Sequence, residues 1–168
     1  MRISIGILLL LSTLLWGESV DDRTVQPLDN TKVESVKEAF RILVQAYKDK
    51  DINRFMHQVN EDQFQQDYMT FEDAIRQDFR IYTLYNLDYW FEQFTPDQET
   101  LMYVKVRWRK EYEQLTTSQM QRKRGVSWFL FSQHNHEYKL IAMAGEAMWG
   151  ESRLEWLQET PISTKKMK

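Results

Sequence analysis

Hydrophobic positions between residues 31 and 81 recur at helical spacing and predict three helices. The first helix is expected to begin at Thr31, which forms a capping box with the glutamate three residues later, and its apolar face continues to Tyr47. Asp51 is expected to cap a second, shorter helix. Thr70 resembles the start of a third helix, whose pattern fails near Ile81.

The period then changes from that of a helix to that of a strand. Apolar and polar residues alternate over residues 87–91 and again over 102–108, which predicts two strands with one buried face each. The run VSWFLF at 126–131 is apolar on both faces, as in a central strand, and YKLIAMA at 138–144 predicts a fourth strand. Four consecutive strands favour an antiparallel meander.

The second and third predicted strands are connected by a polar segment. The stretch TTSQMQRKRG at 116–125 is interpreted as a turn between the second and third strands. Lys110 and Tyr112 follow the alternating run of the second strand, so that strand is expected to extend beyond the core. Helices that precede an antiparallel run of strands predict the α+β class, with the helices packed on one face of the sheet.

This order of elements resembles the nuclear transport factor 2-like superfamily. The resemblance rests on VESVKEAFRILVQAYKDKDINRFM at 33–56, the strand YNLDYWFEQF at 85–94 and the hairpin from LMYVKVRW to VSWFLF. It implies a cone-like fold in which three N-terminal helices pack on a curved four-stranded antiparallel sheet around a pocket. The superfamily includes dehydratases, isomerases, polyketide cyclases and proteins without activity, so the resemblance selects no reaction.

The N-terminus has the pattern of an export signal. Arg2 precedes an apolar run over 3–15, and Gly17 and Ser19 place small residues before a predicted cleavage at Val20. The uncharged run is shorter than the roughly 20 residues that span a bilayer, so we expect the leader to contact the membrane only transiently. A bacterial protein in the periplasm or secreted is therefore predicted, and the alternative is a membrane-held assembly component with an uncleaved leader.

Four regions are expected along the chain: a signal peptide at 1–19, a flexible lead-in at 20–30, the cone-like domain at 31–150 and a C-terminal tail at 151–168. The chain has no cysteine, so its stability must come from packing, for which the 14% of aromatic residues provide material. A net charge of −3 argues against a nucleic-acid-binding protein. No cofactor is predicted.

The resemblance implies that an enzyme of this type would use an Asp or His base facing a tyrosine donor. The weak candidates for such catalysis are His57, Asp78, Tyr82, Tyr85 and Asp88. We expect His57 at the surface or the edge of the core, and Asp78 on a solvated helix face. His134 and His136 are spaced to share a strand face, but a polar hairpin tip is favoured over a metal site because no third ligand completes the set.

Two groups of side chains suggest binding. Aromatic residues of the predicted sheet either line a pocket for an apolar ligand or fill the core: Tyr89, Trp90, Tyr103, Trp108 and Trp128. The basic residues of 105–110 and 122–124 either dock an acidic partner or anionic lipid, or simply protect strand edges.

The leading hypothesis is thus an exported domain without catalytic activity that binds a small apolar ligand or an envelope protein, with a homodimer as a further possibility. A cofactor-independent dehydratase or isomerase is the alternative.

Overall fold

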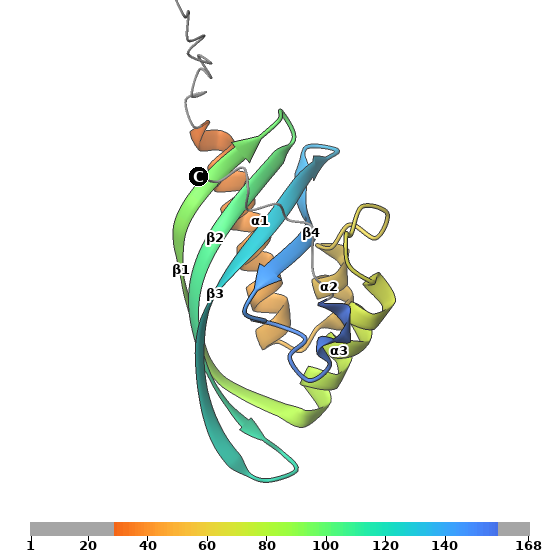
Figure 1. Cartoon of the computed structure of the whole chain (residues 1–168), viewed down its shortest axis with the longest axis vertical. Coiled ribbons are helices and arrows are strands. Elements are labelled where there is room, and N and C mark those ends of the chain that lie inside the picture. Colours follow the sequence, from red (N-terminus) through yellow and green to blue (C-terminus); the bar gives the residue numbers. More distant parts are fainter. Residues whose placement is uncertain (1–28, 158–168) are drawn as a thin grey trace, which may run out of the picture.

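Three helices precede four strands along the chain, which confirms the predicted α+β order (Figure 1). The computed structural model describes residues 29–157, so the predicted leader, its cleavage site and the lysine-rich C-terminal end lie outside the described residues. The elements are α1 Asn30–Lys48, α2 Ile52–His57, α3 Tyr68–Ile81, β1 Tyr82–Asp97, β2 Leu101–Gln114, β3 Gln119–His134, β4 Glu137–Gly145 and the 3₁₀ turn η1 Leu154–Trp156. Within this part of the chain, no helix is long and apolar enough to cross a membrane.

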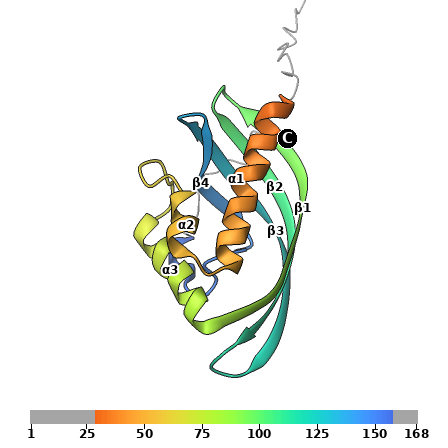
Figure 2. The ribbon, with the colours of Figure 1, turned by 180° about the vertical axis from the view of Figure 1, so that it is seen from behind.

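The strands form one antiparallel sheet in the order β1-β2-β3-β4, as the sequence predicts. β-Bulges in β1, between Leu84 and Asn86 and between Phe91 and Gln93, interrupt its register with β2. Such bulges bend a strand and increase its twist. The sheet therefore curves, and α1 packs along its inner face (Figure 2).

The core lies between α1 and the inner face of the sheet, and aromatic rings fill its centre. The ring of Phe40 on α1 lies 5.0–5.5 Å, centroid to centroid, from those of Tyr89, Phe91, Phe129 and Trp149. Each such side chain removes about 150–250 Å² from water. This cluster gives a chain without cysteine its hydrophobic stabilisation.

Aspartates cap all three helices. Asp51 caps α2 as predicted, but α1 starts one residue earlier than expected, because the Asp29 carboxylate accepts the amide of Thr31 at 2.9 Å. Likewise Asp67, not Thr70, caps α3, and its carboxylate accepts the amide of Thr70 at 2.6 Å. In both cases an aspartate precedes the predicted threonine and satisfies an otherwise free amide of the first turn.

The basic stretch that the sequence suggested was a turn is mostly strand. Only residues 115–118 turn, and β3 begins at Gln119, opposite Gln114 of β2. Lys110 and Tyr112 are also buried, so the prediction that β2 extends beyond the core is wrong at these positions. Pairing of backbone groups with β2 explains the longer β3, because it does not require apolar side chains. Lys110 and Tyr112 are buried because the segment after β4 packs against them, with contacts from Met148 and Glu151.

The folded domain also extends further than predicted at its C-terminal end. Trp156 is fully buried, its ring lies 4.7 Å from that of Phe71, and its indole N–H donates to the carbonyl of Gly150 at 2.9 Å. Residues 151–157 therefore belong to the packed domain rather than to a tail. A single buried tryptophan in a short irregular segment leaves no periodic signal in the sequence.

Candidate functional site

The mouth of the cone, where α3 meets the segment after β4, contains a buried carboxylate. Asp78 is 1% exposed and accepts hydrogen bonds from the hydroxyl of Tyr47 at 2.7 Å and from the amides of Gly150 at 2.7 Å and Ser152 at 2.9 Å. The prediction of a solvated helix face is wrong here, because Asp78 lies on the side of α3 that holds residues 150–152. This carboxylate anchors the C-terminal segment.

A buried lysine lies close to this anchor. Lys110 on β2 is 2% exposed, donates to the carbonyl of Met148 at 3.2 Å and forms an ion pair with Glu151 at 2.6 Å. Lys123 pairs with the same glutamate. Burial lowers the pKa of Lys110 to about 8, and the charge of Asp78 opposes this shift.

This polar cluster leaves almost no free space. The cavity between Asp78, Lys110, Tyr82 and Tyr112 has a volume of about 10 Å³, whereas ligand pockets usually measure about 300–1,000 Å³. Burial also raises the pKa of Tyr112 to about 12, so its hydroxyl stays protonated at neutral pH. The titratable side chains of Asp78, Lys110, Tyr82 and Tyr112 thus surround a space too small for a substrate.

The five catalytic candidates do not converge on one site. Tyr82 packs against Tyr112 at the mouth, with ring centroids 4.6 Å apart, whereas the exposed Tyr85 donates to Glu113 at 2.7 Å. Asp88 lies on the outer face of the sheet, where its hydrogen bond from Arg109 lowers its pKa.

The three histidines lie near α2 and the turn between β3 and β4, away from Asp78. His57 is exposed, as expected, and faces open hollows that His134 and His136 also line. His136 is in the turn between β3 and β4 with a positive φ of 67°, so it does not share a strand face with His134. In the part of the chain that the structure describes, no group of three or more His, Asp or Glu side chains could hold a metal ion.

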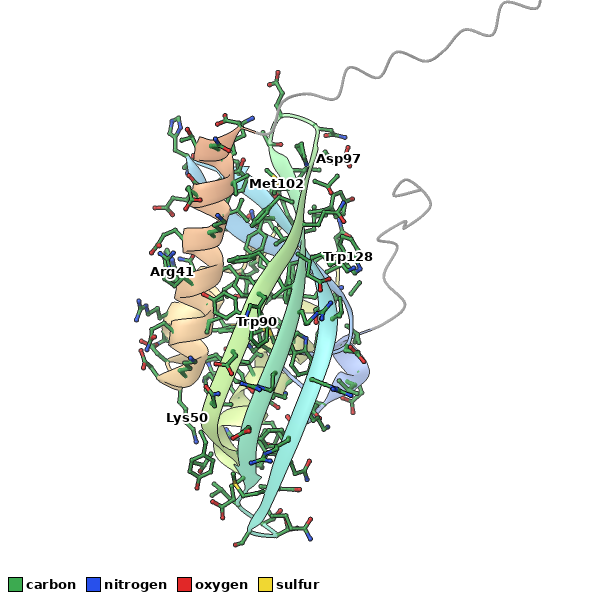
Figure 3. The ribbon with its side chains drawn as sticks, turned by 90° about the vertical axis from the view of Figure 1, so that its left-hand side faces the viewer. Arg41, Lys50, Trp90, Asp97, Met102 and Trp128 are labelled. Atoms are coloured by element: carbon green, nitrogen blue, oxygen red, sulfur yellow. The ribbon has the colours of Figure 1, made fainter. Side chains whose placement is uncertain are left out.

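The outer face of the sheet carries an open groove. Its volume is about 450 Å³, and its floor crosses three strands, with Trp90 opposite Arg107 and Arg109 opposite Arg124. Trp90 is 51% exposed. In Figure 3, Trp90 and Trp128 lie on either side of β2 on the sheet. The residues that line this outer groove are Trp90, Arg107, Trp108, Arg109, Arg124, Gly125, Val126 and Glu146.

The outer groove contains one cation without a partner. Arg109 forms an ion pair with Asp88 at 2.6 Å, and Nε of Arg107 donates to Glu92 at 2.7 Å. Arg124 has no ion pair with any residue of 29–157. The groove therefore presents a guanidinium group, available to an acidic ligand, beside an exposed indole ring.

The predicted aromatic pocket is divided between the two faces of the sheet. Tyr89 and Trp108 point inward and fill the core, and the indole N–H of Trp108 donates to Ser127 at 2.7 Å. Trp90, Tyr103 and Trp128 belong to the outer face. Alternation along each strand separates these side chains. Trp90 and Trp108 both line the outer groove, but Tyr89, Tyr103 and Trp128 do not, so the five residues form no common pocket.

No protein-family model matches the sequence, and no curated protein shows significant similarity to it. Solved structures are similar in fold. A ketosteroid isomerase-like protein from Erwinia carotovora atroseptica matches 71% of this chain and 99% of its own, with a TM-score of 0.61 at 9% identity. A nuclear transport factor 2-like superfamily protein from Salmonella enterica matches 71% and 93%, with a TM-score of 0.58 at 7% identity.

A protein of the same fold and unknown function from Shewanella oneidensis matches 69% of this chain and 99% of its own, with a TM-score of 0.54 at 10% identity. At such low identities these similarities establish the fold and carry no residue roles.

Proposed function

We propose that this chain, whose fold is that of the nuclear transport factor 2-like superfamily, is a non-catalytic domain that binds an acidic partner protein through the outer face of its sheet. One contrast supports the proposal. The cavity beside Asp78 has a volume of about 10 Å³, whereas the outer groove has a volume of about 450 Å³ and exposes Trp90 beside arginines. Tryptophan and arginine are the residues most enriched at the energetic centres of protein interfaces.

The chemistry of the mouth argues against the dehydratase or isomerase alternative. A carboxylate that acts as a general base must lie within hydrogen-bond reach of the proton it abstracts from the substrate. Asp78 instead binds Tyr47 and the backbone of residues 150–152, and the surrounding cavity is too small for a substrate. The same packing argues against a small apolar ligand in the cone.

The charges of the outer groove favour an acidic partner. Arg107 and Arg109 are neutralised by acidic residues of β1, whereas Arg124 has no such partner among the described residues. An acidic side chain that meets Arg124 would form a charge-assisted hydrogen bond, which is stronger than a neutral one.

Cross-linking from the groove tests this function. We would replace Trp90 with the photo-reactive residue p-benzoylphenylalanine and irradiate intact cells of the source organism. The expected result is one adduct of defined mass, which Arg124→Glu abolishes by reversing the charge of the groove. The control is the same replacement at Met69 on α3, which is 65% exposed and does not line the outer groove.

Two outcomes would contradict the proposal: no adduct from position 90, or the same adducts from positions 90 and 69. An adduct of twice the chain mass would identify a homodimer instead of a different partner.

We further propose that the predicted leader directs the protein to the periplasm or outside the cell. The pattern of Arg2, the apolar run and the small residues before Val20 supports it. Sequencing the N-terminus of the protein from its own cells is the test, and Val20 is expected first. A retained Met1 or Arg2 would favour a membrane-held component.

A further inference from the structure

The unpaired edge of β3 offers a second recognition element beside the outer groove. β3 pairs with β2 from Gln119 to Ser132, but β4 pairs with β3 only from Ser127 onward. In the described part of the chain, residues 119–126 therefore have no neighbouring strand on their other side. Figure 1 shows this part of the β2–β3 hairpin projecting past the end of β4.

We propose that this edge binds an extended acidic segment of the partner as an added strand. The inference rests on the proposed function, because it names how the partner of the outer groove is held. The edge and the groove are continuous, since Arg124 and Val126 belong to the edge and also line the groove.

The direction of the backbone groups supports strand addition. Val126 uses its amide and carbonyl on this edge, donating to the Glu146 carboxylate at 2.6 Å and accepting the Glu146 amide at 3.2 Å. Backbone groups alternate along a strand, so those of Met120, Arg122 and Arg124 face the same edge. They have no partner among residues 29–157. Unpaired groups of this kind are a template for another strand.

The side chains along the edge define the sequence of the added strand. Arg122 and Arg124 point to the outer face. Arg122 forms an ion pair with Glu111 at 3.1 Å, so Arg124 is the cation that an acidic side chain of the added strand would meet first. On the inner side of the edge lies a hollow of about 550 Å³. Its apolar lining comes from Trp108, Ala147, Leu154 and Leu157, and the charged side chains of Lys123, Glu146 and Glu151 also line it. The edge therefore fits a segment in which acidic and apolar residues alternate.

Charge argues against two other occupants. The same edge of a second copy would bring Arg122 and Arg124 against identical cations, which is destabilising. The C-terminal residues of this chain include Lys165, Lys166 and Lys168, which carry the same sign of charge. The arginines that prevent self-association thus also select an acidic partner.

A matched pair of variants tests the role of the backbone. Arg124→Ala and Arg124→Pro both remove the guanidinium group, but only the proline removes the edge N–H. The pairing with β2 should survive in both, since an edge strand tolerates proline where the N–H faces away from its neighbour. The probe is a fluorescent peptide, Glu-Val-Glu-Leu-Glu-Val-Glu, and its anisotropy reports binding to the full chain.

We expect Arg124→Ala to weaken binding of this peptide about tenfold, and Arg124→Pro to weaken it by about a further fivefold. A control peptide with the same residues in two blocks, four glutamates and then the apolar residues, should bind far more weakly. Equal binding of the two variants, or of the two peptides, would overturn strand addition.

Hydrogen exchange gives an independent test on the wild-type chain, in case proline disturbs the hairpin. Peptide should slow amide exchange at Met120, Arg122 and Arg124, whereas Gln121 and Lys123 face β2 and should already exchange slowly. No slowing would overturn the inference, as would a peptide that binds only after residues 158–168 are deleted. The Trp90 adduct remains a separate test, so strand addition can fail while the proposed function stands.

Discussion

Two buried charged residues, Asp78 and Lys110, have a structural role although residues of this kind are common in active sites. Their partners are instead the backbone and side chains of residues 148–152. These buried charges therefore attach the segment after β4 to the rest of the domain. We call the hydrogen bonds of Asp78 with Gly150 and Ser152 the latch.

Asp78→Asn tests the latch. The amide can accept fewer hydrogen bonds than the carboxylate, and its NH₂ group would face the donors of Gly150 or Ser152. We expect the free energy of unfolding to fall by about 2–4 kcal/mol, measured by denaturant unfolding. Asp73→Asn, at an exposed position of the same helix, should change it by less than about 0.5 kcal/mol. Equal effects of the two substitutions would show that the latch contributes nothing.

Lys110 gives a pH-dependent prediction. Its pKa is about 8 in the folded protein, compared with about 10.4 for an unperturbed lysine. The unfolded chain therefore binds more protons between these values, so the contribution of Lys110 to stability rises with pH. From pH 7.5 to 9.5, the wild type should gain about 1–2 kcal/mol relative to Lys110→Met. Chemical unfolding of both proteins across this range is the measurement, and parallel pH profiles would contradict the low pKa.

At the scale of elements, β3 has different surroundings along its length. Its C-terminal half lies between β2 and β4, whereas its N-terminal half is a basic edge. The change occurs near Gly125, where a Cβ atom would lie 2.6 Å from both the Trp108 ring and the Glu146 carboxylate. The absence of a side chain here lets Trp108 reach Ser127 beneath the strand.

Gly125→Ala should therefore displace Trp108 and Glu146 and destabilise the protein by about 1–3 kcal/mol. The displacement would be seen as a change in the fluorescence of a variant in which Trp108 is the only tryptophan of the sheet. Arg124→Ala is the control, because its side chain lies on the outer face and its loss should leave the core intact. A Gly125→Ala protein as stable as the control would show that this close approach is not required.

At the scale of the whole molecule, the segment after β4 fills the space between the helices and the sheet. Its residue Trp149 packs between helices and sheet, with ring centroids 5.3 Å from both Phe55 and Phe129. The space that this fold offers to a ligand is thus filled by the chain itself. This packing is consistent with the proposed binding at the outer groove and the β3 edge.

A pair of tryptophan variants separates these roles. Trp149→Ala should lower the free energy of unfolding by about 3–5 kcal/mol, because it leaves a cavity in the aromatic core. Trp90→Ala should change it by less than about 0.5 kcal/mol, since the side chain is exposed, but should weaken binding of the partner. Calorimetric unfolding measures the first effect. A Trp90→Ala protein as unstable as Trp149→Ala would contradict the division between core and binding surface.

Much of the fold was accessible from sequence because it depends on local periodicity. The apolar stripe from Val33 to Tyr47 requires a helix with one buried face, and the alternation from Met102 to Trp108 requires a half-buried strand. α1 begins one residue before its predicted start at Thr31, and α3 begins two residues before its predicted start at Thr70. Aspartate and threonine are both good caps, so the sequence alone does not decide between them. The basic part of β3 was missed because its pairing partner lies on another strand.

The candidate site was much less predictable than the fold. Each of Trp90, Arg107, Arg109 and Arg124 is visible in the sequence, but only the register of β1, β2 and β3 brings them into one groove. Asp78 and Lys110 looked like surface residues, because the groups that bury them come from residues 146–157.

The sequence by itself therefore determined the class of fold, the faces of its helices and strands, and the absence of disulfides, since these follow from side-chain period and composition. The tertiary structure alone decided that the cone is filled, that its acid is a latch and that the exposed tryptophan and arginines share one surface. The physical reason is that contacts between residues far apart in the chain depend on strand register and on the path of an irregular segment, and neither leaves a local pattern.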